Sequence, residues 1–140
     1  MTAVVDTSVL FAQRSAHDEY HEQAREIIAG VDHGQLPEFH ITDHVLAETL
    51  NLIQNKADHQ KATQTMALLI EGSHFHLRHT PKADFNSTQA LFRRHSHLSF
   101  VDASIVAFMQ REGIEYLYSF DDGFDTIEGI TRLNTAVDPR

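Results

Sequence analysis

Short apolar runs alternate along the chain with longer segments in which apolar residues recur at helical spacing. The short runs, rich in valine, phenylalanine and tyrosine, predict strands over residues 3–5, 39–42, 74–78, 116–120 and 131–133. Apolar residues three or four positions apart predict helices over residues 17–29, 43–55, 59–71, 81–94 and 99–112. Residues 7–11, directly after the first strand, are expected to form a turn and a short apolar stretch.

Glycine, threonine and proline mark where several of these helices begin or end. Gly30, Gly72 and Gly113 each follow a predicted helix, where glycine is the preferred terminating residue. Thr80 and Pro81 are expected to be the N-cap and the first residue of the helix that runs to residue 94. These residues therefore set the expected boundaries of the elements.

Strands that alternate with helices of this length need crossover connections. The sequence therefore predicts an α/β fold, with a mainly parallel sheet and helices on both of its faces. No internal repeat or flexible linker divides the chain, so residues 1–140 are expected to form a single domain. Ligands of such sheets bind beyond the carboxyl ends of the strands, so residues directly after a strand are the first candidates for function.

Composition and charge narrow the classes of function. With 41% hydrophobic and 22% charged residues, the chain resembles a folded globular protein, and no apolar run is long enough to cross a membrane. The absence of cysteine excludes disulfides, thiolate metal sites and a cysteine nucleophile. The first residues do not resemble a secretory signal, so we expect a cytoplasmic protein. A net charge of −9 repels a phosphate backbone, so a nucleic-acid substrate requires a bridging cation.

Asp102 is the most informative acidic residue, because its helix is apolar almost all round. A buried carboxylate is costly unless it is paired, hydrogen-bonded or bound to a metal ion. The alternative is structural: in the sequence from Ser99 to Asp102, the aspartate could be the third residue of a capping box. The sequence leaves both interpretations open.

Four other acidic residues have similar alternatives. Asp6 and Asp121 each follow a predicted strand, and Glu48 borders the apolar stripe of its helix. Asp6 could cap a turn, Glu48 could be an ordinary solvated side chain, and Asp121 and Asp125 could be loop acids. Taken singly, none of them defines a site.

Together, these residues resemble a known pattern. The motifs Val4-Val5-Asp6-Thr7-Ser8, Glu48, Ser99-Phe100-Val101-Asp102-Ala103 and Ser119-Phe120-Asp121 with Phe124-Asp125 occur in the order and spacing of PIN-domain ribonucleases. The resemblance covers nearly the whole chain, and it is strongest to the small VapC-like toxins of toxin–antitoxin pairs. Each motif is degenerate, but four in the right order form a fairly specific signal.

The resemblance implies an endoribonuclease that hydrolyses RNA phosphodiester bonds and leaves 5′-phosphate and 3′-hydroxyl ends. It implies an Mg²⁺ or Mn²⁺ site formed by Asp6, Glu48, Asp102 and Asp121, with Asp125 as an additional catalytic acid. Ser8 and Ser119 match hydroxyl positions that line the site, and are the expected substrate-binding residues. A homodimer and an antitoxin partner whose segment covers the site are also implied.

Other interpretations were weighed against this one. A catalytically silent PIN-like module that acts through protein contacts is the main alternative. A phosphoaspartate hydrolase needs a second acid where this chain has Ser8, and a phosphorelay receiver needs a lysine after a late strand. The 11 histidines do not match a zinc motif and are read as solvated side chains. Arg93 and Arg94 could contact an RNA backbone, but the safer interpretation is that they favour a negative helix terminus.

Overall fold

The fold is built around a single parallel sheet. The computed structural model describes residues 1–140, and its five strands lie in the order β3-β2-β1-β4-β5. All four neighbouring pairs are parallel. The strands are β1 (Thr2–Val5), β2 (Glu38–Thr42), β3 (Phe75–Arg78), β4 (Tyr116–Tyr118) and β5 (Thr131–Leu133). The predicted α/β class is thereby confirmed.

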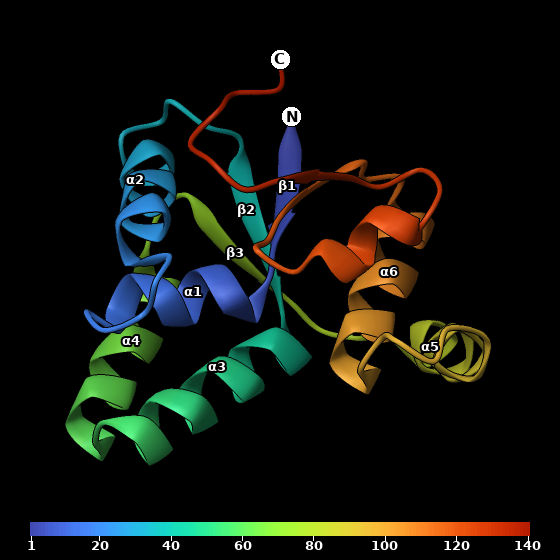
Figure 1. Cartoon of the computed structure of the whole chain (residues 1–140), viewed down its shortest axis with the longest axis horizontal. Coiled ribbons are helices and arrows are strands. Elements are labelled where there is room, and N and C mark those ends of the chain that lie inside the picture. Colours follow the sequence, from blue (N-terminus) through green and yellow to red (C-terminus); the bar gives the residue numbers. More distant parts are fainter.

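Six α-helices and one short 3-10 helix connect these strands. They are α1 (Thr7–Arg14), α2 (His21–Asp32), α3 (Asp43–Lys56), α4 (His59–Glu71), α5 (Lys82–Arg94), α6 (Phe100–Glu112) and η1 (Asp122–Thr126). Helices α1 to α4 lie on one side of the strands and α5 and α6 on the other (Figure 1). Both faces of the sheet are covered, as the sequence predicted. None of the helices combines the length and apolar character needed to cross a membrane.

Local capping fixes several boundaries as the sequence predicted. The Thr42 side chain accepts a hydrogen bond from the Val45 backbone and caps α3. Helix α6 begins after Ser99 and ends at Gly113, which adopts the left-handed conformation (φ 69°) that glycine favours. Helix α4 ends at Gly72. These ends depend on residues close in sequence, which explains why they were predictable.

Several boundary predictions were wrong. Helix α2 begins at His21 rather than at residue 17, and β4 ends at Tyr118 rather than at residue 120. Residues 7–14 form helix α1 rather than a turn and apolar stretch, because Asp6 caps the chain as it leaves β1. Gly30 does not end α2, which continues to Asp32: Leu36 packs against Gly30, and a Cβ there would lie 2.8 Å from the leucine side chain. Thr80 does not cap α5, because its side chain donates to Asp43 instead.

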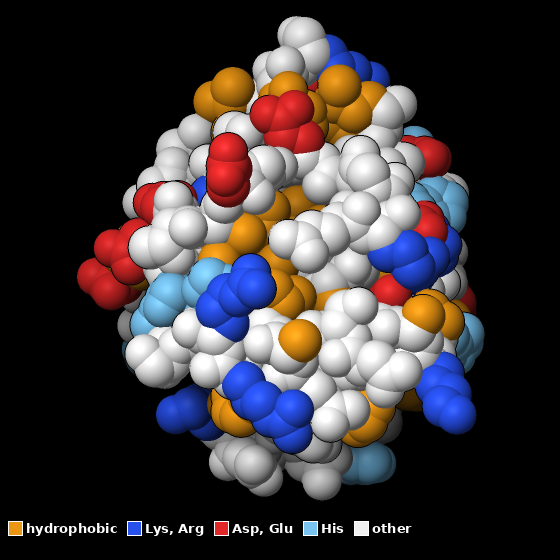
Figure 2. Space-filling view, turned by 90° about the vertical axis from the view of Figure 1, so that its right-hand side faces the viewer, with side chains coloured by type: hydrophobic (Ala, Val, Ile, Leu, Met, Phe, Trp, Pro, Cys, Tyr) orange, Lys and Arg blue, Asp and Glu red, His pale blue; other side chains and the backbone are white.

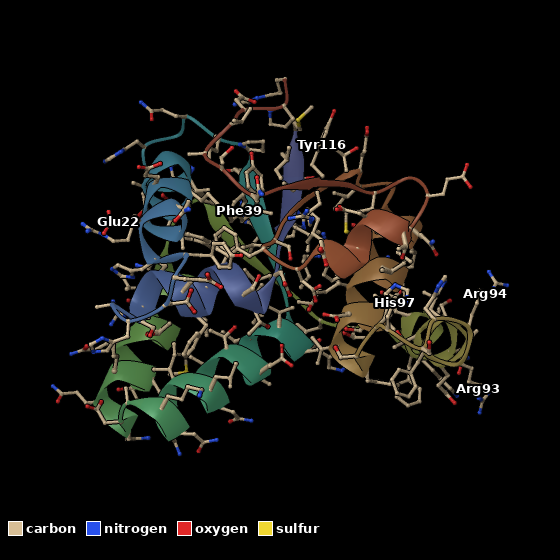
Figure 3. The ribbon with its side chains drawn as sticks, viewed as in Figure 1. Glu22, Phe39, Arg93, Arg94, His97 and Tyr116 are labelled. Carbon is tan, nitrogen blue, oxygen red and sulfur yellow. The ribbon has the colours of Figure 1, made fainter.

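The strand order places the candidate site. From β1 the chain proceeds outward through β2 to β3, and then returns across the other face to β4, on the opposite side of β1. The carboxyl ends of β1 and β4 are therefore a topological switch point, where parallel sheets bind ligands. Asp6 directly follows β1 and Ser119 directly follows β4. Behind them lies a buried core in which Phe39 points from the sheet toward α1 and α2 (Figure 3).

Candidate active site

Asp6 is the most buried acid of the candidate site, with 4% of its surface exposed. Its Oδ1 accepts a hydrogen bond from the Thr7 backbone N–H at 2.8 Å. Its Oδ2 accepts from the hydroxyls of Ser8 at 2.9 Å and of Ser119 at 2.8 Å. The Asp6 side chain is therefore held in one orientation by donors from both ends of the chain.

The two serine hydroxyls also hold the segment after β4. The Ser8 Oγ accepts from the Phe120 backbone N–H at 3.1 Å, and the Ser119 Oγ accepts from the Asp121 backbone N–H at 3.0 Å. Each hydroxyl thus donates to Asp6 and accepts from a different residue of that segment. This arrangement holds the Asp121 backbone close to the Asp6 side chain.

The protonation of Asp6 is perturbed. The pKa of Asp6 is raised from 3.8 to about 6, mainly by burial; the negative charge of Asp102 also raises it, and the hydrogen bonds from Ser119, Ser8 and Thr7 lower it. An acid held near neutrality by burial and by a like charge is typical of functional sites. A divalent cation beside it would favour the charged form and lower its pKa.

Asp102 forms the capping box that the sequence allowed, and its functional role remains a prediction. Its carboxylate accepts from the Ser99 backbone N–H at 3.2 Å, and the Ser99 hydroxyl accepts from the Asp102 backbone, which completes the capping box. Burial raises the pKa of Asp102, and the negative charges of Asp121 and Glu48 raise it further. The capping box therefore places the carboxylate within the field of the other acids.

The structure brings together four of the five predicted acids. Asp6 follows β1, Glu48 projects from α3, Asp102 lies in the first turn of α6, and Asp121 caps η1 by accepting from the Gly123 backbone at 2.9 Å. Asp102 lies within electrostatic range of the other three: its charge raises the pKa of Asp6, and the charges of Asp121 and Glu48 raise its own, in each case less than burial does. Nowhere in the chain do three acidic or histidine side chains already converge tightly enough to enclose an ion.

This donor set fits a hard divalent cation. All of the available ligands are carboxylate oxygens, which Mg²⁺ and Mn²⁺ prefer to softer donors. Mg²⁺ also retains several waters and takes one or two carboxylates together with substrate phosphate, so a closed cage of three side chains is not required. The excess negative charge around buried Asp6 is a further physical reason for a cation at this position.

The fifth predicted acid, Asp125, has a different partner. Both of its carboxylate oxygens accept from the Arg132 guanidinium at 2.9 Å, and Arg132 also donates to the Ser119 carbonyl at 3.2 Å. This ion pair lowers the pKa of Asp125. Asp125 thus contacts an arginine that supports the Ser119 backbone, and its predicted catalytic role remains a prediction.

Two open hollows flank the acids. One, of about 450 Å³, is lined by Glu48, Phe100 and neighbouring residues of α3 and α6. The other, of about 610 Å³, lies beside Ser8 and Asp121 and contains Tyr20 and Phe120 in its wall. Sequence reasoning had assigned these two aromatic residues to a helix stripe and a strand, and had proposed no base-stacking residue. No local signal marks them, because only the fold brings residues 20 and 120 together.

No lysine or arginine lines either of the two hollows. Arg93 and Arg94 point outward from the end of α5 (Figure 3). On the face formed by α5 and α6, the arginine and lysine side chains are spread singly among acidic and uncharged ones (Figure 2). Most phenylalanines are at least partly buried, but Phe85 and Phe92 of α5 are exposed and lie near Phe100.

Comparison with known proteins shows the family of the chain. The PIN domain family model matches residues 3–130, so the chain belongs to the PIN domain family. VapC20 of Mycobacterium tuberculosis, a 23S rRNA-specific endonuclease, is 30% identical over 122 residues, which cover 86% of this chain and 89% of the relative.

Solved structures show the same fold. The crystal structure of M. tuberculosis VapC20, described as a sarcin–ricin loop cleaving toxin, superposes with a TM-score of 0.78 at 28% identity, over 88% of this chain and 92% of that one. VapBC2 from Rickettsia felis, bound to a DNA fragment from its promoter, superposes with a TM-score of 0.70 at 12% identity, over 96% and 99%. The second match shows the fold alone.

Proposed function

We propose that this chain is a metal-dependent endoribonuclease and the toxin of a type II toxin–antitoxin pair. The observation that carries the proposal is the placement of buried Asp6 at the switch point of the sheet, with Asp102 within range of its charge and with Glu48 and Asp121 beside Asp102. Membership of the PIN domain family and the likeness to VapC20 support the same activity. We take residues 1–140 as one nuclease domain.

Asp6, Glu48, Asp102 and Asp121 are the proposed metal ligands, with Mg²⁺ or Mn²⁺ as the ion. When bound, such an ion would lower the pKa of a coordinated water and neutralise charge on the phosphodiester. Asp6 is kept in position by Ser8 and Ser119, so that its orientation does not depend on the substrate. Asp102 is held by the helix cap of α6, which limits the movement of its carboxylate.

A bridging cation also resolves the problem of charge. The chain carries −9 overall, and a phosphate backbone would be repelled by the acids of the site. The acids attract a divalent ion, and the ion then offers positive charge to the phosphate. Ser8, which lines the hollow beside Asp121, is also proposed to contact the substrate. Ser119 was expected to do so too, but it is fully buried, so its proposed role is to position Asp6.

The direct test is an assay of purified protein on RNA. VapC20 acts on 23S rRNA, so a ribosomal RNA stem-loop and an unstructured RNA of equal length are the first substrates to compare. We expect cleavage with Mn²⁺ or Mg²⁺ and none with EDTA. The Asp6→Asn variant should be inactive, while Asp32→Asn, at the exposed end of α2, is the matched control.

The alternative, a silent interaction module, predicts no cleavage and need not bind Mn²⁺. Calorimetric titration with Mn²⁺ separates the two, because the nuclease proposal requires binding that Asp6→Asn weakens. Several structural neighbours are complexes of toxin with antitoxin, including one from Klebsiella pneumoniae. For this chain, we propose an antitoxin partner that inhibits cleavage and a homodimer, which co-purification and light scattering respectively would test.

A further inference from the structure

The hollow beside Ser8 and Asp121 has an aromatic wall. Tyr20 and Phe120 stack with ring centroids 4.6 Å apart and an angle of 11° between the planes. Phe11 and Leu52 complete the apolar part of the lining. A volume of about 610 Å³ falls within the range of roughly 300–1,000 Å³ typical of small-molecule sites.

Hydrogen bonds connect this aromatic wall to the acid site. Phe120 lies between Ser119 and Asp121 in the chain, and its backbone N–H donates to the Ser8 hydroxyl at 3.1 Å. The stack therefore connects the segment before α2 directly to the hydrogen bonds that hold Asp6. Tyr20 is 38% exposed, so the tyrosine retains accessible surface while its ring packs on Phe120.

The charges around the hollow select among possible ligands. Asp18, Glu19 and Asp121 are among the lining residues, together with His17 but no lysine or arginine. A second phosphate would be repelled here, because the three carboxylates outnumber the single imidazole. A flat, uncharged group that carries N–H donors suits both the aromatic surface and the acceptors. A nucleobase has this chemistry.

We infer that this hollow, beside Ser8 and Asp121, is a subsite for one unpaired base next to the cleaved phosphodiester bond, with Tyr20 as the residue on which the base stacks. The inference rests on the proposed ribonuclease function. Bases that are unstacked from a helix are the ones that proteins bind by aromatic stacking. An unpaired loop nucleotide, rather than a paired stem, is therefore the preferred substrate at this position.

The test combines a protein change with a matching RNA change. The cleaved bond is mapped first, and RNAs are then made that lack only the base on its 5′ side or only the base on its 3′ side. Rates with Mn²⁺ are measured for wild type, Tyr20→Ala and Tyr20→Phe, with Phe85→Ala as a control at an exposed aromatic residue of α5.

We expect one of the two abasic RNAs to lower kcat/KM of wild type by about 5- to 150-fold, the loss of one base–aromatic stack. On the intact RNA, Tyr20→Ala should lower kcat/KM by a similar factor. On the affected abasic RNA, its kcat/KM should be close to that of wild type on the same RNA. Tyr20→Phe and Phe85→Ala should behave as wild type.

Two results overturn the subsite. The first is that the wild-type protein cleaves both abasic RNAs as fast as the intact RNA. This result needs no variant, so it counts even if Tyr20→Ala fails to fold. The second is that the loss of kcat/KM caused by Tyr20→Ala and the loss caused by removing a base multiply for both abasic RNAs. The tyrosine would then act independently of either base. If wild type cleaves no RNA, the proposed function fails first, and the subsite fails with it.

Discussion

The Ser119 hydroxyl donates a 2.8 Å hydrogen bond to the carboxylate of Asp6, a residue 113 positions earlier in the chain. The bond joins the end of β4 to the end of β1. At this point the chain stops adding strands on one side of β1 and begins adding them on the other. A buried acid, an adjacent hydroxyl and three further acids from separate elements are thus assembled by the topology of the sheet.

Asp6→Asn and Asp102→Asn are each expected to abolish metal-dependent RNA cleavage and to leave the protein folded. Asparagine retains an oxygen that can accept the backbone hydrogen bonds of Thr7 and Ser99, but it removes the negative charge. In EDTA both variants should melt at or above the temperature of wild type, because repulsion between acids is relieved. Circular dichroism and a gel assay measure both effects, and undiminished cleavage by both variants would refute the site.

The pH dependence of stability should report the titration of Asp6. Because its pKa is raised from 3.8 to about 6 on folding, Asp6 favours the folded state below about pH 4, and this contribution is lost as pH rises through 6. The difference of roughly two pKa units corresponds to about 3 kcal/mol. In EDTA, wild type should therefore lose stability relative to Asp6→Asn between pH 4 and pH 7.5.

Urea unfolding of both proteins at several pH values measures this difference. Comparison with the variant is needed because Asp43, Glu112 and Asp125 have lowered pKa values and act in the opposite direction. Saturating Mn²⁺ at pH 7.5 should stabilise wild type more than Asp6→Asn. A stability difference that stays constant with pH is the contradictory outcome.

Ser119→Ala should shift the acid side of the pH–rate profile toward higher pH. The Ser119 hydrogen bond is the largest of the influences that lower the pKa of Asp6, and its loss favours the protonated acid. A hydrogen bond to a charged group contributes about 1.5–3 kcal/mol, so cleavage below pH 7 should slow by about tenfold or more. Ser8→Ala should cause a smaller shift, and a uniform loss at all pH values would point to a structural effect alone.

Asp121 and Asp125 should differ in their contribution to cleavage. The negative charge of Asp121 raises the pKa of Asp102. The Asp125 carboxylate is instead bound by Arg132. Asp121→Asn is expected to lower kcat/KM by at least about 100-fold, equivalent to about 2.7 kcal/mol, and Asp125→Asn by less than about tenfold. Equal losses would place Asp125 among the acids that hold the cation.

The sequence by itself determined the elements whose ends depend on neighbouring residues. The boundaries at Thr42, Ser99 and Gly113 follow from caps within a few residues, and the alternation of strands with helices implied a parallel sheet. The same order placed Asp6 and Asp121 after strands, and so at one edge of the sheet. These inferences were possible because hydrophobic period and capping are local properties.

Tertiary structure alone decided the remaining features. Gly30 continues a helix because Leu36 packs on it, Asp125 is bound by Arg132, and Tyr20 meets Phe120 across 100 positions of sequence. Each depends on contacts between segments that no local pattern connects. The raised pKa of Asp6 has the same origin, because burial and the charge of a distant aspartate exist only once the chain has folded.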